Sequence, residues 1–307
     1  YILLTQRAGG ATMPRYQTID LRGQSLRSGL SDTLIRAIHS HLEARGQVLV
    51  YLNRRGFAPT LVCKACGWQN VCSDCDARLT LHRQPEQLIC HHCNLRFDLP
   101  RQCEKCGHHD LLPVGTGTQR AEEGLAELFP DIPLYRIDRD TTRSNAQLNS
   151  QLEKIQLGDP CIMVGTQMLA KGHHFRQVTL VAVINADAGF LSPDFRAPER
   201  TAQLIVQVAG RAGRAEKQGE VWIQSYQPEN PLLQRLISQG YRGFAEAELR
   251  SRMQAGLPPA QPMAMLRAES IDPSLARDFL SRCKASFESG AKSQQNMTGL
   301  NILGPIP

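Results

Sequence analysis

The sequence contains no run of 18 apolar residues, and this absence argues against a membrane-spanning helix. It also lacks the charged and then apolar leader of a secreted protein, and it starts at Tyr1 rather than at a methionine. The last residues, Leu303 to Pro307, contain neither a helix end nor a tail. We therefore expect a piece of a longer protein with no membrane association.

Chain length and net charge restrict the number of domains and the class of partner only slightly. The 307 residues suffice for one sizeable core and smaller modules, so two or three domains are expected. The formal net charge of +6 favours an anionic partner, although a mild basic excess is common among proteins.

Cysteine is concentrated in one short window, where eight of the ten cysteines form C-x-x-C pairs. The pairs are Cys63/Cys66, Cys72/Cys75, Cys90/Cys93 and Cys103/Cys106. A two-residue gap presents two thiolates to one tetrahedral ion, so the repeated pairs indicate two zinc sites rather than disulfides. Sites with four cysteines are closed and structural, and a thiol-rich window suits a reducing cytoplasm.

Four pairs can serve two ions in three ways. Joining the first pair to the second leaves five residues between them, which is short for the hairpin of a zinc ribbon. Joining the second to the third leaves fourteen residues, in which Leu79, Leu81 and Leu88 alternate around a turn at Pro85. We therefore favour a nested arrangement in which the first and fourth pairs close the base of the window.

Other residues near the pairs have less specific roles. The histidines could replace a thiolate, but eight thiolates already fill two tetrahedral sites. They are His82, His91, His92, His108 and His109. Gly67 and Gly107 directly follow two of the pairs, where tight turns would donate amides to thiolates. Cys161 and Cys283 are interpreted as small hydrophobic residues.

Outside the window, apolar strands alternate with helices. Strands are expected at 47–52, 133–137, 161–164, 180–184 and 220–226, and helices at 31–44, 118–128, 145–157 and 198–209. Continuous apolar strands that alternate with helices predict an α/β fold with a parallel sheet covered on both faces.

The chain therefore divides into four parts. A polar, Gly-rich connector covers residues 1–30, and the α/β domain covers 31–62 and 111–230. A zinc-binding insert with two ions covers 63–110. Residues 231–307 would begin a further domain, of partial α+β type.

A second group of chemically informative residues follows the helix at 198–209. Gln207, Gly210, Arg211 and Arg214 form the pattern Q-x-x-G-R-x-x-R. Two arginines three apart on one helical turn can both face a nucleotide, and phosphoryl transfer needs such positive charge as its transition state develops. A solvated basic helix face is the alternative. We favour the nucleotide because the glycines, the glutamine and an α/β domain accompany the arginines.

A loop earlier in the chain suits the same chemistry. The segment GTQMLAKGHHF, residues 165–175, starts at the carboxyl end of an expected strand, where parallel sheets place their ligand-binding loops. Gly165 and Thr166 can offer an amide and a hydroxyl to a phosphate of DNA or nucleotide. Lys171 and Gly172 fit the same environment.

An equally informative absence concerns the rest of a nucleotide site. The sequence has no G-x-x-x-x-G-K-[ST] loop and no acidic Walker B or DEAH-like box. These motifs supply the phosphate cradle and a magnesium ligand. The chain therefore carries one half of a two-lobed site.

Taken in order, these residues resemble the second RecA-like lobe of superfamily 2 helicases and, more closely, the PriA family of bacterial replication-restart helicases. The resemblance covers essentially the whole chain. Besides the cysteine window, it rests on VYLNRRGFAP (50–59), RIDRDTT (136–142), GTQMLAKGHHF (165–175), PDFRAPER (193–200) and QVAGRAGR (207–214). The double zinc insert directly after NRRGFAP is the most specific element, since generic superfamily 2 proteins lack it.

The resemblance implies the C-terminal portion of an ATP-dependent 3′-to-5′ DNA helicase for replication restart and primosome assembly at stalled forks and D-loops. Arg211 and Arg214 would be arginine fingers, with Gln207 near the nucleotide. Gly165, Thr166 and Lys171 would lie between DNA and nucleotide.

The resemblance also implies cofactors and partners. The cofactors would be two zinc ions and, in the full protein, ATP with Mg²⁺. Forked and single-stranded DNA, primosome proteins such as PriB, and single-stranded DNA-binding protein would be the partners of a cytoplasmic, nucleoid-associated monomer. We expect the chain alone to be inactive, and a non-catalytic zinc scaffold for DNA and primosome proteins is the alternative.

Overall fold

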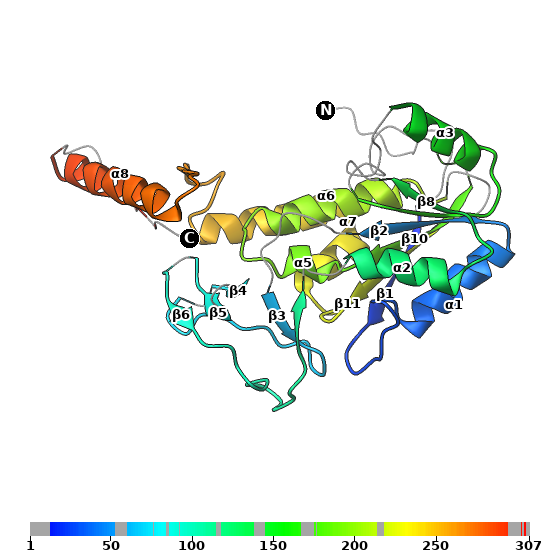
Figure 1. The fold of residues 1–307 in the computed structure, drawn as a ribbon, viewed down its shortest axis with the longest axis horizontal. Helices are drawn as coiled ribbons and strands as arrows, with labels where there is room; N and C mark the ends of the chain where they lie inside the picture. Colours follow the sequence, from blue (N-terminus) through cyan, green and yellow to red (C-terminus); the bar gives the residue numbers. More distant parts are fainter. Residues whose placement is uncertain are drawn as a thin grey trace.

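A six-stranded parallel sheet forms the centre of the computed structural model (Figure 1). The structure describes residues 13–52, 60–75, 77–83, 86–91, 93–114, 118–137, 145–166, 175, 177–213, 218–293, 302 and 304. In spatial order the strands are β1 (Arg15–Asp20), β11 (Glu220–Ser225), β10 (Val178–Ile184), β2 (Gln47–Leu52), β9 (Ile162–Gly165) and β8 (Leu134–Ile137). Every neighbouring pair is parallel, which confirms the predicted α/β fold.

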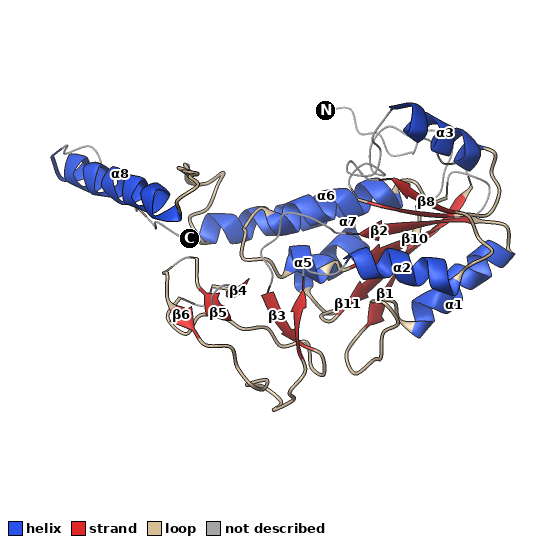
Figure 2. Cartoon of the chain, viewed as in Figure 1, coloured by secondary structure: helices blue, strands red, loops and turns tan. Residues whose placement is uncertain are grey.

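Helices cover both faces of this sheet (Figure 2). On one face lie α1 (Asp32–Glu43) and α2 (Thr118–Leu128), and on the other lie α3 (Asn145–Gln156), α6 (Ala197–Ala209) and α7 (Pro231–Gln254). Because helices lie on both faces, all residues of strand β2 are buried. Val48 and Val50 pack toward α1 and α2, whereas Leu49 and Tyr51 pack toward α6 and α7. Burial on both sides explains why the strand is a continuous apolar run.

Helix α1 illustrates how the local sequence sets an element. The Ser31 hydroxyl accepts a hydrogen bond from the Leu34 amide at 3.2 Å, which satisfies one amide at the start of the helix. Past its end, the Gly46 amide donates to the His41 carbonyl at 2.8 Å. A Cβ at Gly46 would lie 2.1 Å from the Thr179 hydroxyl, so only glycine fits against β10.

Residues 1–30, predicted as a connector, include a strand of the central sheet. Within this stretch, Arg15–Asp20 forms β1, an edge strand that pairs in parallel with β11. The segment RYQTID is mostly polar, so it lacks the apolar run by which the inner strands were recognised. An edge strand needs less burial, and polar residues are common there.

The boundary predicted at residue 231 also needs correction. Helix α7 contributes Leu233, Leu236 and Phe244 to the same buried cluster as α6, so it belongs to the α/β lobe. Gly240, with φ 68°, interrupts its helical backbone. Helix α8 (Pro273–Ser293) lies apart from the sheet in Figure 1. No strand occurs between residues 231 and 293, so the α+β character expected there is absent from that described stretch.

The cysteine window forms a separate module after β2. Its two ends pair as an antiparallel ribbon, β3 (Thr60–Cys63) with β7 (Leu111–Val114). Between them lies a small antiparallel sheet of β4 (Thr80–Arg83), β5 (Glu86–Ile89) and β6 (Arg96–Phe97). The pairing of β4 with β5 confirms the predicted hairpin, although its turn at Pro85 lies outside the described residues. Over the described part of the chain, no helix has the length and apolar character needed to cross a membrane.

Candidate functional site

The eight paired cysteines form two sets of four thiols. Cys63, Cys66, Cys103 and Cys106 make one set, and Cys72, Cys75, Cys90 and Cys93 make the other. Within each set all sulfur atoms lie within 4.8 Å of one another. The structure therefore has the nested arrangement that the hairpin argument favours.

The sulfur spacing fits zinc. Zn–S bonds of about 2.3 Å in a tetrahedron place the sulfurs about 3.8 Å apart. The Cys63–Cys106 and Cys66–Cys103 sulfur distances are 3.6 and 3.7 Å. In the other set, the Cys72–Cys93 and Cys75–Cys90 distances are 3.4 and 3.5 Å. A disulfide would need about 2.0 Å, so both sets fit closed Cys₄ zinc sites.

A repeated turn builds these sites. The first cysteine of each pair donates its amide to the carbonyl five residues later, as in the 2.7 Å bond from Cys63 to Trp68. In three of the turns the fourth residue after that cysteine has a positive φ and donates back to the cysteine carbonyl. Those residues are Gly67, Asn94 and Gly107. Glycine and asparagine are the residues that tolerate this left-handed backbone best.

The turns that contain Gly67 and Gly107 donate backbone amides to thiolates, as the sequence predicts. The amides of Gly67 and Gly107 donate to cysteine carbonyls rather than to thiolates. The residue after each glycine reaches the sulfur instead, because the Trp68 amide bonds to Cys66 and the His108 amide bonds to Cys106. Chiefly through that amide bond, the pKa of Cys106 falls to about 7, whereas burial raises the pKa of Cys66 to about 12. The case for a metal site therefore rests on the sulfur geometry.

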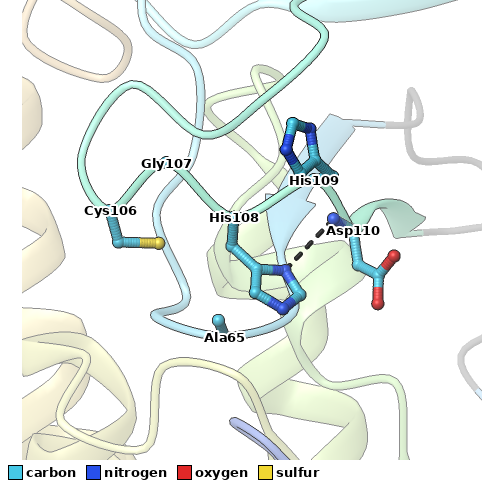
Figure 3. A pocket seen from close by; sticks show the side chains of 6 residues that line it. All are labelled: Ala65, Cys106, Gly107, His108, His109 and Asp110. Atoms are coloured by element: carbon cyan, nitrogen blue, oxygen red, sulfur yellow. Dashed lines mark hydrogen bonds between the residues drawn. The ribbon is translucent and has the colours of Figure 1, made fainter.

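Histidine takes no part in either set of four thiols among the described residues. His82 and His91 instead approach each other, with 2.9 Å between their Nε2 atoms. Figure 3 shows the hollow beside Cys106, where the His108 ring faces the Asp110 amide. That amide donates to His108 Nδ1 at 3.1 Å, which ties the imidazole to the backbone. His92 lies outside the described residues.

The residues predicted to contact nucleotide or DNA are divided between two sides of the parallel sheet. One is the carboxyl edge, where the strands end, and the other is the amino edge, where they begin. Gly165 is the last residue of β9, level with Tyr51 and Ile137, so Gly165 and Thr166 stand at the carboxyl edge. Helix α6 starts after β10 at that same edge and returns across the sheet. At its far end the Gly213 amide bonds to the carbonyl of Val178, the first residue of β10.

Of the residues predicted on α6 and just after it, three are described. Gln207 is exposed and Gly210 is half-buried at the end of the helix, whereas Arg211 is only 9% exposed. Both Gly210 and Arg211 stand at the amino edge, away from Thr166. Lys171, Gly172 and Arg214 lie outside the described residues. The structure thus brings the thiols together but separates Gly165 and Thr166 from Arg211.

Sequence reasoning missed a buried carboxylate at the carboxyl edge. Asp187, the first residue of α5 (Asp187–Phe190), accepts hydrogen bonds from the Ser225 hydroxyl at 2.6 Å and the Tyr226 amide at 2.7 Å. Burial raises the pKa of Asp187 to about 6. The side chain joins the loop after β10 to the loop after β11. Its only sequence signal is an aspartate among small residues directly after an apolar strand.

Comparison with known proteins gives consistent similarities. Residues 72–96 match the PriA DNA helicase Cys-rich region (CRR) domain. Replication restart protein PriA of Haemophilus influenzae is 47% identical over 307 residues, which is all of this chain and 41% of the relative. The Bacillus subtilis protein of the same name is 36% identical over 267 residues, or 86% of this chain and 33% of the relative. The chain thus spans less than half the length of these relatives.

A solved structure was also found to be similar. Saccharomyces cerevisiae Dbp5 L327V bound to RNA and ADP BeF3 aligns over 78% of this chain and 44% of its own, with a TM-score of 0.36 and 8% identity. This likeness is slight, and the sequence relatives are the informative comparison.

Proposed function

We propose that this chain, which belongs to the PriA family of replication restart proteins, is one portion of an ATP-dependent 3′-to-5′ DNA helicase. The complete protein would restart replication and assemble the primosome at stalled forks and D-loops. The observation that supports this most is the combination of two Cys₄ sites with a parallel sheet whose helix α6 leads into Gly210 and Arg211. The Haemophilus influenzae relative is similar along the full chain, so the similarity spans both the cysteine window and the sheet.

The two edges of the sheet suggest separate binding sites for nucleotide and for DNA. We assign the nucleotide to the amino edge, where Arg211 and Arg214 would act as arginine fingers and Gln207 and Gly210 would lie near the phosphates. We assign DNA to the carboxyl edge, where Gly165 and Thr166 can meet a phosphate group. Lys171 and Gly172 lie outside the described residues, and we assign them to the contact between DNA and nucleotide on the family resemblance alone.

In this arrangement the chain's own contribution to chemistry is positive charge. Bound ATP with Mg²⁺ would supply the phosphoryl group, and its cradle would come from a lobe with the Walker motifs that this sequence lacks. The guanidinium groups of Arg211 and Arg214 would stabilise the charge that develops on the transferring phosphoryl oxygens. Arg211 is already only 9% exposed in this chain, and a covering second lobe would exclude the remaining water, which strengthens that interaction.

The zinc sites would have a structural role. Four thiolates leave no open position on a tetrahedral ion, so the two ions would fold the insert rather than take part in hydrolysis. We assign the RecA-like lobe to residues 31–62 and 111–230 together with β1 and α7, and the insert to residues 63–110. Forked and single-stranded DNA, PriB and single-stranded DNA-binding protein are the partners we propose, in the cytoplasm at the nucleoid.

A second candidate function applies to the chain by itself. Because it lacks the Walker motifs, it would act alone as a zinc scaffold that binds DNA and primosome proteins without turnover. The closed Cys₄ geometry favours this reading of the insert.

Forked-DNA-stimulated ATP hydrolysis separates the two candidates. We expect no hydrolysis by this chain and robust hydrolysis by the full-length protein. In the full-length protein, Arg211→Ala should lower kcat by about a thousandfold, as loss of an arginine finger does, while DNA affinity stays unchanged. Arg101→Ala, which removes an exposed arginine of the insert, is the matched control and should hydrolyse ATP normally. Near-normal hydrolysis by Arg211→Ala would refute the finger assignment.

A further inference from the structure

The insert is docked on three neighbouring loops at the carboxyl edge of the sheet. The backbone at Gly67 lies so close to the loop after β11 that a Cβ there would be 2.2 Å from the Tyr226 carbonyl oxygen. From the same loop, Gln227 Nε2 donates to the Gly67 carbonyl at 2.6 Å. After β1, the Gly23 amide donates to the Lys64 carbonyl at 3.1 Å. The first cysteine turn is therefore fixed to the loops after β1 and β11.

Two insert side chains hold the third loop, which joins α5 to α6. Gln69 Nε2 donates to the Leu191 carbonyl at 2.7 Å. The Arg78 guanidinium donates to the Phe190 carbonyl and, at 3.5 Å, to the Ser192 carbonyl. Three successive carbonyls of the lobe are thus bound by side chains of the insert. Hydrogen bonds from a guanidinium are among the stronger ones in proteins.

The surroundings of Arg78 connect it to α6 and α7. Burial lowers the pKa of Arg78, and the carboxylate of Glu248 on α7 opposes this by attraction. Glu248 also accepts a hydrogen bond from Arg252 Nε at 3.0 Å. Arg252 in turn pairs with Glu199, in the first turn of α6, at 2.9 Å. Charged groups therefore link the insert to the start of α6 through α7.

The position of Arg78 depends on the fold of the insert. Arg78 lies three residues after Cys75 and forms a β-bridge with Val71, next to Cys72. The insert has a small apolar cluster that includes Cys72 and Cys90 themselves. Without metal, four converging thiols lose the bond that holds them together, and this part of the insert would lose its fold.

We propose that Arg78 and Gln69 are positioning residues through which the zinc-folded insert fixes the loop Phe190–Ser192 and thereby the start of α6. Helix α6 has 13 residues and spans about 20 Å, so it carries this placement to Gln207, Gly210 and Arg211 at the amino edge. Zinc would in this way order the nucleotide edge from the opposite side of the sheet. The effect on ATP hydrolysis rests on the function proposed above, whereas the positioning of α6 does not.

Amide hydrogen exchange of residues 187–199 tests the positioning directly in the zinc-loaded 307-residue chain. We expect exchange in Arg78→Ala to be about tenfold faster than in the unchanged chain, because the charge-assisted hydrogen bonds to the Phe190 and Ser192 carbonyls are lost. Gln69→Ala should accelerate the same segment by a smaller factor, and Arg78→Lys should fall between Arg78→Ala and the unchanged chain. Arg101→Ala is the control and should leave exchange unchanged. Zinc content should remain two ions in all four variants.

Removal of zinc by a chelator completes the test. In the unchanged chain it should accelerate exchange of residues 187–199 at least as much as Arg78→Ala does. Identical exchange in the unchanged, zinc-free and substituted chains would overturn the proposal. If Arg78→Ala releases zinc, the Gln69→Ala result decides, and normal exchange there with zinc bound would also overturn it.

Kinetics of the full-length protein distinguish a failure of the positioning role of Arg78 from a failure of the proposed helicase function. Arg78→Ala should lower kcat for DNA-stimulated ATP hydrolysis several-fold with little change in KM for ATP, because a misplaced Arg211 weakens transition-state contacts. An unchanged kcat would refute the link to the nucleotide edge. Absence of hydrolysis in the unchanged full-length protein would refute the proposed function, and the exchange result would stand independently.

Discussion

The α/β lobe buries two large apolar clusters, one on each face of its sheet, whereas the insert has one small cluster. Two of the six buried residues in that small cluster are Cys72 and Cys90, whose thiols belong to a candidate metal site. Apolar burial contributes about 25 cal/mol per Å², so the lobe can be stable without metal. The insert has only this small cluster, so we expect its fold to depend on bound zinc.

The largest expected effect concerns metal in the insert. Cys72→Ser should release one of two zinc ions and unfold β4–β6, because binding contributes on the order of 10 kcal/mol to folding of such sites. Metal analysis per chain and hydrogen exchange over residues 77–97 measure both effects. Cys283→Ser, outside both sets of thiols, is the control and should keep both ions. Retention of both ions by Cys72→Ser would contradict the pairing.

The next effect concerns apolar packing in the lobe. Leu49 on β2 is fully buried, so Leu49→Ala should lower the free energy of unfolding by about 2–5 kcal/mol. Denaturant titration followed by far-ultraviolet circular dichroism measures this loss. Zinc content should stay at two ions, since Leu49 belongs to the cluster around α6 and α7 rather than to the insert. Loss of zinc in this variant would show that the two regions do not fold separately.

A smaller effect depends on pH. The pKa of Asp187 is raised from 3.8 to about 6, so the folded lobe holds this proton more tightly than the unfolded chain does. Stability from this group is therefore greatest below pH 4 and is lost as the pH rises toward 6. Relative to Asp187→Asn, which does not titrate, the lobe should lose at most about 3 kcal/mol over that interval. A pH-independent difference between the two proteins would refute the raised pKa.

The smallest effect is at a helix end. Ser31→Ala removes the hydroxyl that accepts from the Leu34 amide, and it should cost about 1 kcal/mol of lobe stability. Thermal unfolding measures the change. Ser31→Gly, which adds no volume at this fully buried position, should cost only a few tenths of a kcal/mol. Equal stability of Ser31→Ala and the unchanged chain would show that the cap is replaceable.

Patterns with a local physical cause were predictable from the sequence. Inner strands such as β2 and β10 are buried on both faces, so they appear as apolar runs. The spacing between cysteine pairs favoured the nested arrangement, because the fourteen residues between the second and third pairs leave room for a hairpin. The cap at Ser31 has an equally local origin.

Features that depend on distant segments were not predictable. Strand β1 is polar, and only its pairing with β11, some two hundred residues later, makes it part of the sheet. Arg78 and Gln69 look like ordinary polar residues of the insert until Phe190–Ser192 lies beside them. Asp187 likewise has its partners on β11 and the loop after it. The separation of Thr166 from Arg211 follows from strand direction, which the motifs themselves do not contain.

The ribbon formed by β3 and β7 has a consequence for protein engineering. Thr60 and Val114 are direct partners in that ribbon, so the chain enters and leaves the insert at neighbouring points about 5 Å apart. Such a junction permits transplantation: a short turn could replace everything beyond the ribbon, and the excised segment could be spliced into a hairpin of an unrelated host. The ribbon is therefore an insertion point at which modules of quite different size could replace one another without a change in the order of the strands in the sheet.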